Sequence, residues 1–144
     1  MRLTAILLVL ATSASAQSFT EPERGSELRT DLLDALRPTA EWNLGAPVEF
    51  VVQEMRVSGD VAFVAVWAQR PGGAQIDVEQ TPSAQHEWID WTVGDGPSIQ
   101  ALMKKEGRMW VAVEIGINPT ERWYDDQRFC PLWHAVLDPD ICGG

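Results

Sequence analysis

The feature that most constrains the fold is a change in hydrophobic period near residue 45. Before this point an apolar residue recurs at every fourth position, which is the spacing of one face of an α-helix. Beyond it, apolar and polar residues alternate, as in a β-strand with one buried face. The sequence therefore predicts the α+β class, with an N-terminal helix followed by strands. The helical face consists of Leu28, Leu32, Leu36, Ala40 and Leu44.

The predicted helix has recognisable ends. Ser26 is a typical N-cap, and Glu27 places a negative charge in the first turn, near the positive end of the helix dipole. Gly45 is a natural C-cap, and Pro47 prevents the helix from continuing. Pro38 removes a backbone donor inside the pattern, so we expect it to kink the helix or to split it in two.

A first hairpin follows the helix. Apolar residues alternate over 48–57 but change parity near residues 53–54, which predicts a β-bulge at that position. Residues 58–60, Ser-Gly-Asp, are typical of a turn. Residues 61–68 are apolar on both faces, as expected for a central strand.

A second hairpin is predicted by alternation over 99–103 and over 109–117, with a turn at 105–108. The segment 109–117 is the strongest strand signal in the chain. Between the hairpins the pattern is weaker, and residues 76–78 and 88–93 are interpreted as two further short strands. Alternating strands have one buried face that needs a cover, and the amphipathic helix supplies it.

The sequence of the C-terminal part predicts a short helical tail. We expect a helix over 120–129, capped by Thr120, and one more turn over 131–136. The two cysteines of the chain, Cys130 and Cys142, are predicted to form a disulfide that staples this tail. A metal site is a weaker alternative, because two thiols without a CxxC spacing are poor zinc ligands.

The N-terminus has the pattern of a secretory signal peptide. Arg2 is followed by an apolar run and by Ala14-Ser15-Ala16, which fits a signal-peptidase site with Gln17 as the new N-terminus. The run is shorter than the roughly 20 residues of a membrane-spanning helix. We therefore expect a signal peptide over 1–16, a flexible lead-in over 17–25 and a single domain over 26–144, in a periplasmic or secreted protein without a membrane span.

Charge limits the partners. The chain has 21 acidic and 11 basic residues and a net charge of −10. This balance argues against nucleic acid and anionic membrane surfaces, which bind clusters of Lys and Arg. The acidity serves either solubility or the recognition of a cationic ligand. Seven Trp residues supply large apolar rings that suit a core or a binding face.

Several stretches resemble a group of uncharacterised bacterial exported proteins. The resemblance covers roughly residues 28–120, and it implies a cystatin-like or NTF2-like arrangement, in which a helix is cradled by a curved antiparallel sheet. The expected fold is therefore a kinked N-terminal helix packed on a curved antiparallel sheet of four or more strands, with a short helical C-terminal tail. The resemblance implies no activity and no functional residues. The stretches that carry it are 32–38, 45–52, 56–64, 107–114 and 116–120.

Two aromatic and acidic stretches are candidate ligand-binding sites. In the first, Trp88 and Asp90 would share one face of a strand and Trp91 would lie on the other. A carboxylate among Trp rings has a raised pKa and suits general-base chemistry; the alternative is an edge strand with Trp anchors in the core. In the second, Trp123 and Tyr124 either stack on a cationic or sugar-like ligand or pack their helix onto the sheet.

No cofactor or metal is expected. The two histidines, His86 and His134, are 48 residues apart, and His86-Glu87 lacks the second histidine of an HExxH zinc site. The first functional hypothesis is a non-catalytic exported module that binds a protein, peptide or small molecule. The second is a small NTF2-like enzyme with Asp90 as a general base. An enzyme needs a closed, partly apolar cavity between helix and sheet with a perturbed carboxylate inside it, whereas a binding module needs an exposed apolar patch.

Overall fold

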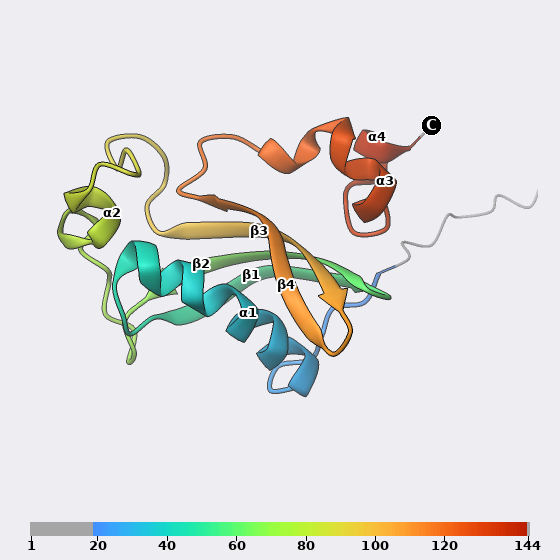
Figure 1. Ribbon diagram of the computed structural model, residues 1–144, viewed down its shortest axis with the longest axis horizontal. Helices are drawn as coiled ribbons and strands as arrows, with labels where there is room; N and C mark the ends of the chain where they lie inside the picture. The colour runs from blue at the N-terminus through green and yellow to red at the C-terminus, as the bar shows by residue number, and fades with distance from the viewer. Residues whose placement is uncertain (1–18, 144) are drawn as a thin grey trace, which may run out of the picture.

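The computed structural model describes residues 19–143, and the fold is of the α+β class (Figure 1). One long helix precedes a sheet of four antiparallel strands, and short helices follow the sheet. The predicted signal peptide, residues 1–16, lies outside the described residues. The elements are α1 (Glu27–Leu44), β1 (Glu49–Ser58), β2 (Val61–Gln69), η1 (Val78–Gln80), α2 (Pro82–Gln85), β3 (Ser98–Glu106), β4 (Met109–Ile117), η2 (Trp123–Asp125), η3 (Gln127–Phe129), α3 (Cys130–Trp133) and α4 (Pro139–Cys142).

The sheet is a meander in the order β1-β2-β3-β4, so both predicted hairpins are confirmed. The register of β1 against β2 shifts between Val52 and Glu54, which confirms the predicted bulge. The bulge explains the change of parity, because one extra residue moves all following side chains to the opposite face. Strand β2 lies between two neighbours and is buried along most of its length, as its apolar sequence indicates.

Helix α1 begins and ends where the sequence predicts. The Ser26 hydroxyl accepts a hydrogen bond from the Arg29 amide, and Gly45, at a φ of 77°, donates its N–H to the Glu41 carbonyl. Pro38 lies inside the helix without splitting it, contrary to one of the two expected outcomes. Burial of the helical face before and after Pro38 holds the helix together across the lost backbone hydrogen bond.

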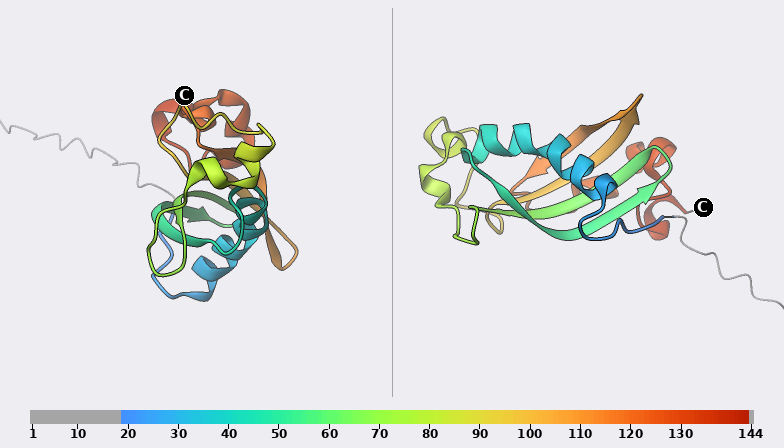
Figure 2. Two further views of the ribbon diagram at one scale, coloured as in Figure 1. Left: turned by 90° about the vertical axis from the view of Figure 1, so that its left-hand side faces the viewer. Right: turned by 90° about the horizontal axis from the view of Figure 1, so that it is seen from below.

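Both faces of the sheet are covered, each by a different part of the chain. Helix α1 lies across one face of the sheet (Figure 2). Leu32, Leu36 and Leu44 of the helix pack there against strand residues. The C-terminal tail covers part of the other face, where Trp133 packs and its indole N–H donates to the Met103 carbonyl at 2.9 Å. The other buried members of this second cluster are Val61, Phe63, Leu102, Phe129, Val136 and Leu137.

Two predictions between β2 and β3 are wrong. Residues 76–78 and 88–93 form no strand; the segment instead contains η1, α2 and a series of turns. The apolar residues whose spacing resembled that of strands instead anchor a loop to the core. Ile76 is buried in the core cluster, and Trp91 packs against it. Gly94 and Gly96 both adopt positive φ, which bends the chain sharply before β3.

The predicted helix over 120–129 is also wrong. Two 3₁₀ turns, η2 and η3, replace it, and Thr120 caps neither of them. Asp126 between them has an extended backbone, and its carboxylate accepts the Arg128 N–H at 2.9 Å. Asp side chains that bond a nearby backbone amide compete with helical hydrogen bonds, which explains the break.

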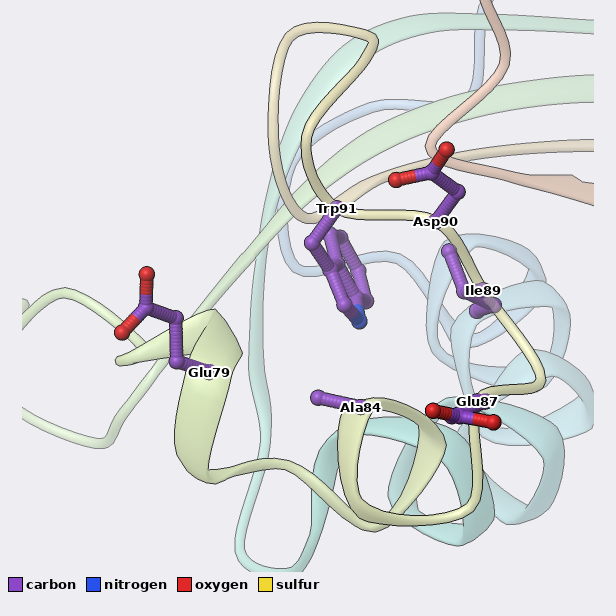
Figure 3. Close-up of a pocket in the computed structure, with 6 residues that line it drawn as sticks. All are labelled: Glu79, Ala84, Glu87, Ile89, Asp90 and Trp91. Atoms are coloured by element: carbon purple, nitrogen blue, oxygen red, sulfur yellow. The ribbon is translucent and has the colours of Figure 1, made fainter.

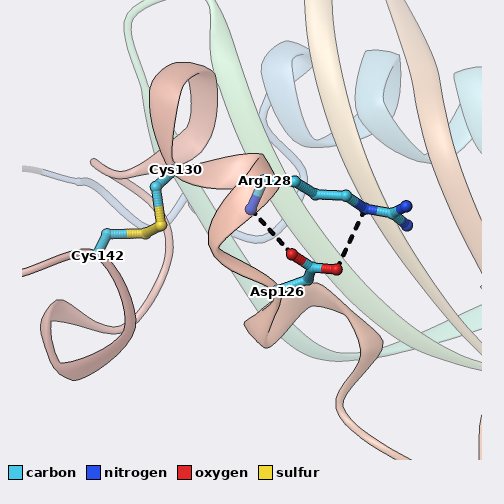
Figure 4. The surroundings of a disulfide bond; sticks show 4 residues. All are labelled: Asp126, Arg128, Cys130 and Cys142. Carbon is cyan, nitrogen blue, oxygen red and sulfur yellow. Dashed lines mark hydrogen bonds and ion pairs between the residues drawn. A yellow bond between two sulfur atoms is a disulfide. The ribbon is translucent and has the colours of Figure 1, made fainter.

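The tail is stapled as predicted. The sulfur atoms of Cys130 and Cys142 lie 2.05 Å apart, and their Cα atoms lie 5.4 Å apart (Figure 4). The bond closes a short loop that contains α3 and α4. It links the start of α3 to the end of α4, so the segment between them, which supplies Trp133, Val136 and Leu137 to the second cluster, is held against the sheet.

The part of the lead-in that the structure describes, residues 19–25, contacts the sheet. Thr20 forms an isolated antiparallel bridge with Val57 on the outer edge of β1, with both N–O distances at 2.8 Å. Pro22 is buried, and Phe19 packs against the second cluster. Within residues 19–143, no helix combines the length and apolar character needed to cross a membrane.

Candidate functional site

The candidate site is built on the connection between β2 and β3, which forms a lobe at one end of the molecule around α2 (Figure 1). Asp77 and Thr81 cap the two short helices of this lobe: their side chains accept the Glu79 and Ala84 amides at 3.2 and 3.3 Å. Pro82 at the first position of α2 suits a helix start because it needs no donor there. The lobe therefore has defined local structure even though it contains no strand.

Trp91 anchors the lobe to the rest of the domain. Its indole N–H donates to the Ser83 hydroxyl at 3.2 Å, and that hydroxyl is 3.2 Å from the Thr81 hydroxyl. Ser83 and Thr81 are fully buried, so this short polar chain is shielded from water. Trp91 is half-buried against the core cluster and serves mainly as an anchor.

Asn118, which sequence reasoning did not single out, holds the last part of the lobe. Its side-chain oxygen accepts the Gly96 amide at 3.1 Å, and its nitrogen donates to the carbonyls of Asp90 and Val93 at 3.0 and 2.7 Å. The residue is 6% exposed and has a φ of 52°, a conformation that Asn adopts more readily than most residues. In the sequence, only its position directly after β4 distinguished Asn118. Its hydrogen-bond partners could not be recognised, because they are more than 20 residues away in sequence.

A row of exposed aromatic rings lies on the lobe. Trp88 is 51% exposed, and its ring is parallel to that of Trp42 with centroids 6.0 Å apart. His86 stacks on Trp88 at 4.7 Å. We call Trp42, Trp88 and His86 the ring stack. Trp42 is 69% exposed on the polar side of α1. Its position outside the apolar face of the helix already indicated an exposed ring in the sequence, and we did not use it.

An open hollow of about 350 Å³ lies in the same lobe. We call it the acidic hollow, because three of its six lining residues are acidic. In Figure 3 the Trp91 indole points toward α2, whereas the Asp90 carboxylate points away on the far side of its loop. The lining residues are Glu79, Ala84, Glu87, Ile89, Asp90 and Trp91.

Asp90 is exposed, and its carboxylate is stabilised by two hydrogen bonds. Its Oδ1 accepts the Thr92 hydroxyl at 2.6 Å and the Thr92 amide at 2.9 Å. These bonds, the hydroxyl first, lower the pKa of Asp90 below its ordinary value because they stabilise the carboxylate. A lowered pKa is the opposite of what the sequence led us to expect for a general base among Trp rings.

The charge of the lobe has a single sign. From Pro71 to Met103 the chain has five acidic residues and no Lys or Arg. Arg70, just before this stretch, is committed to α1: its guanidinium donates to the carbonyls of Leu44, Gly45 and Pro47. Within the described chain, neither Glu79 nor Glu87 forms an ion pair. The lobe thus presents negative charge beside exposed rings.

The second candidate pair, Trp123 and Tyr124, lies elsewhere and is packed. Tyr124 contacts Phe63 with ring centroids 4.6 Å apart, and Trp123 lies so close over Gly116 that a Cβ there would collide with its ring. The Tyr124 hydroxyl accepts Arg122 Nε at 3.1 Å. These two residues therefore serve in packing. They lie against the second cluster and do not line the acidic hollow.

The space between α1 and the sheet is filled. The side chains that meet there, among them Leu32, Leu36, Val64 and Met103, are at most 1% exposed. Within residues 19–143, no three acidic, histidine or cysteine side chains lie close enough together to hold a metal ion. The exposed lobe is therefore the candidate site with the most suitable geometry.

Comparison with models of known protein families finds no match, and searches of curated proteins and of solved structures find no significant match either.

Proposed function

We propose that this protein is an exported, non-catalytic binding module that recognises a positively charged group at the ring stack and the acidic hollow. The observation that carries the proposal is the exposed, parallel pair of Trp42 and Trp88. Large apolar rings held in water on a soluble domain mark interaction surfaces more often than structural ones.

The negative charge of the lobe indicates a positively charged ligand. Trp is the best aromatic partner for a cation, and its attraction is strengthened by carboxylates nearby. Glu87 lies between His86 and Trp88 in sequence and also lines the acidic hollow, so rings and negative charge are contributed by the same short segment. Alkylammonium and guanidinium groups, free or on a peptide, combine the positive charge and apolar surface that such a segment binds.

Binding fits the geometry better than catalysis. A general base that works near neutral pH needs a pKa raised toward that range, by burial or by like charge. The exposed Asp90 carboxylate instead has its pKa lowered by Thr92. The filled space beneath α1 offers no room for a substrate. Both observations support the binding module over the NTF2-like enzyme.

The proposal is tested by titrating the mature protein with tetramethylammonium and with a hexa-arginine peptide, followed by calorimetry and Trp fluorescence. Both probes should bind, and Trp88→Ala should weaken binding by about threefold to thirtyfold, the value of one cation–π contact. Val93→Ala, which removes an exposed apolar side chain from the same loop, is the matched control and should leave affinity unchanged.

The contribution of charge is tested separately. Glu87→Gln should weaken cation binding and reduce its salt dependence, whereas Glu121→Gln, an exposed carboxylate outside the lobe, should do neither. Binding of a neutral sugar such as cellohexaose in place of both cations would favour a stacking site for carbohydrate and refute the cationic class. Equal effects of the two Glu variants would show that only net charge matters.

Export is part of the proposal and rests on the pattern of residues 1–16 and on the paired cysteines, which persist in oxidising compartments. Mass spectrometry of the exported protein should show Gln17 as the first residue; an intact Met1 would contradict it. The resemblance to exported proteins of cystatin-like or NTF2-like arrangement remains a proposal that the arrangement of α1 on the four strands supports.

A further inference from the structure

The backbone at the end of helix α2 fixes two rings of the ring stack relative to each other. The Trp88 amide donates to the Ser83 carbonyl at 2.8 Å, and the Glu87 amide donates to the Ala84 carbonyl at 3.1 Å. This pair of bonds is the Schellman motif, which ends a helix with one residue in the left-handed region. Glu87 is that residue, with a φ of 55°, and it lies between His86 and Trp88.

The two rings that flank Glu87 stack. The centroid of the His86 ring lies 4.7 Å from that of Trp88, and the ring planes differ by 16°. An aromatic face attracts a cation that lies within about 6 Å of its centroid. A protonated His86 therefore makes with Trp88 the same kind of interaction that we propose for the cationic ligand.

His86 differs from the other ionisable side chains of the lobe in when it changes charge. An unperturbed imidazole gains its proton between about pH 8 and pH 5, whereas carboxylic acids as a class do so in stronger acid. The five acidic residues between Pro71 and Met103 are accompanied by no Lys or Arg. Protonation of His86 therefore introduces the one positive side-chain charge of this stretch.

The charged groups of the elements around the ring stack leave His86 without an ion pair in residues 19–143. On α1, Glu41 precedes Trp42, and its carboxylate accepts a backbone amide at 3.2 Å. After β2, the Arg70 guanidinium donates to carbonyls at and just after the end of α1. Helix α2 contains no charged residue, and Glu87 adjoins His86 in the loop. The other carboxylates of the lobe are Asp77, Glu79, Asp90 and Asp95.

We propose that His86 makes cation binding at the ring stack dependent on pH. Its imidazolium form interacts with Trp88 as an internal cation and repels the ligand, so the protein binds cations at neutral pH and releases them in mild acid. The inference rests on the proposed function, because it concerns the same site. Two unit charges roughly 7 Å apart at a protein surface repel enough to change affinity about threefold to tenfold.

The test is titration with tetramethylammonium at pH 8 and at pH 5.5, at constant ionic strength. The natural protein should bind about threefold to tenfold more weakly at pH 5.5. His86→Phe retains a flat ring beside Trp88 but takes up no proton, so its affinity should be the same at both pH values. His134→Phe is the matched control, because His134 is the other histidine of the chain and is exposed in the tail; this variant should retain the pH dependence.

The coupling must also appear on the histidine itself, because linkage between two binding events is reciprocal. Saturating tetramethylammonium should lower the midpoint of the His86 ring titration, followed by NMR, by about 0.5 to 1 pH unit, which is the same factor expressed as proton affinity. The titration of His134 should not move.

The outcomes separate this inference from the cation site on which it rests. Equal affinity at both pH values, or pH dependence that persists in His86→Phe or disappears in His134→Phe, would overturn the role of His86 and leave the cation site in place. Absence of binding at both pH values would refute the proposed function, and the role of His86 with it. Circular dichroism at both pH values shows that each variant is folded.

Discussion

Substitution of Gly94 tests whether the Asn118 contacts hold the lobe. Gly94 has a φ of 85°, and a Cβ at this position would collide with the Asn118 side chain, its Cγ lying only 2.7 Å away. Gly72 has nearly the same φ, 86°, but a Cβ there would meet nothing within 4 Å. Gly72→Ala is therefore a matched control for the backbone effect of Gly94→Ala.

The expected magnitudes follow from this pair. An Ala in a left-handed conformation costs a net of about 1 kcal/mol in either place. At Gly94 the new methyl group must also displace the Asn118 amide, which makes three hydrogen bonds to Gly96, Asp90 and Val93. At about 1 kcal/mol for each bond, Gly94→Ala should lower the free energy of unfolding by about 3 kcal/mol more than Gly72→Ala.

Urea denaturation followed by Trp fluorescence measures both variants. In an Asn118→Ala background the extra cost should disappear, so that Gly94→Ala and Gly72→Ala become equivalent. A difference between the two single variants of less than about 1 kcal/mol would refute the argument, since it would show that the Asn118 bonds contribute little. An unchanged difference in the Asn118→Ala background would show that the strain lies elsewhere.

Three further predictions concern the core, the tail and the lobe. Leu36→Ala should lower the free energy of unfolding by about 2–5 kcal/mol, and Leu132→Ala, at a position that is 40% exposed, by about 1 kcal/mol in the same denaturation assay. Reduction of the disulfide should cost about 3 kcal/mol, because it frees a loop with a sequence separation of 12; an unchanged Tm after verified reduction would contradict this. The lowered pKa of Asp90 means that its contribution to stability is present above the ordinary Asp pKa and is lost as the pH falls through the folded value. Thr92→Val should therefore raise the pKa of Asp90 in an NMR titration, and an unmoved pKa would show that the hydroxyl is not the cause.

Local pattern was sufficient for α1 and for the two hairpins. The recurrence of leucines every four residues, with Ser26 and Gly45 at the ends, predicted α1, and alternation predicted both hairpins. Even the bulge in β1 was visible, since an inserted residue changes the parity of every residue after it. These features are determined by neighbours within a few positions along the chain, which is the range that sequence patterns report.

Local pattern was misleading in the lobe. Ile76 and Trp91 looked like strand residues because buried anchors in a loop are as apolar as those in a strand. The strong alternation of 109–117 predicted β4 but did not show where it would lie in the strand order of the sheet. The order of strands decides which edges are free, and that order is a property of the assembled sheet.

The amino-acid sequence by itself determined α1, the four strands, the turns of the two hairpins and the disulfide, because each depends on short-range periodicity, on turn chemistry or on the presence of only two cysteines. The tertiary structure alone decided that Trp42 meets Trp88, that Asn118 holds the lobe, and that the tail packs over Phe63. Each of these contacts joins residues more than 20 positions apart. Such contacts form only when several elements are packed together, and no repeat along the chain encodes them.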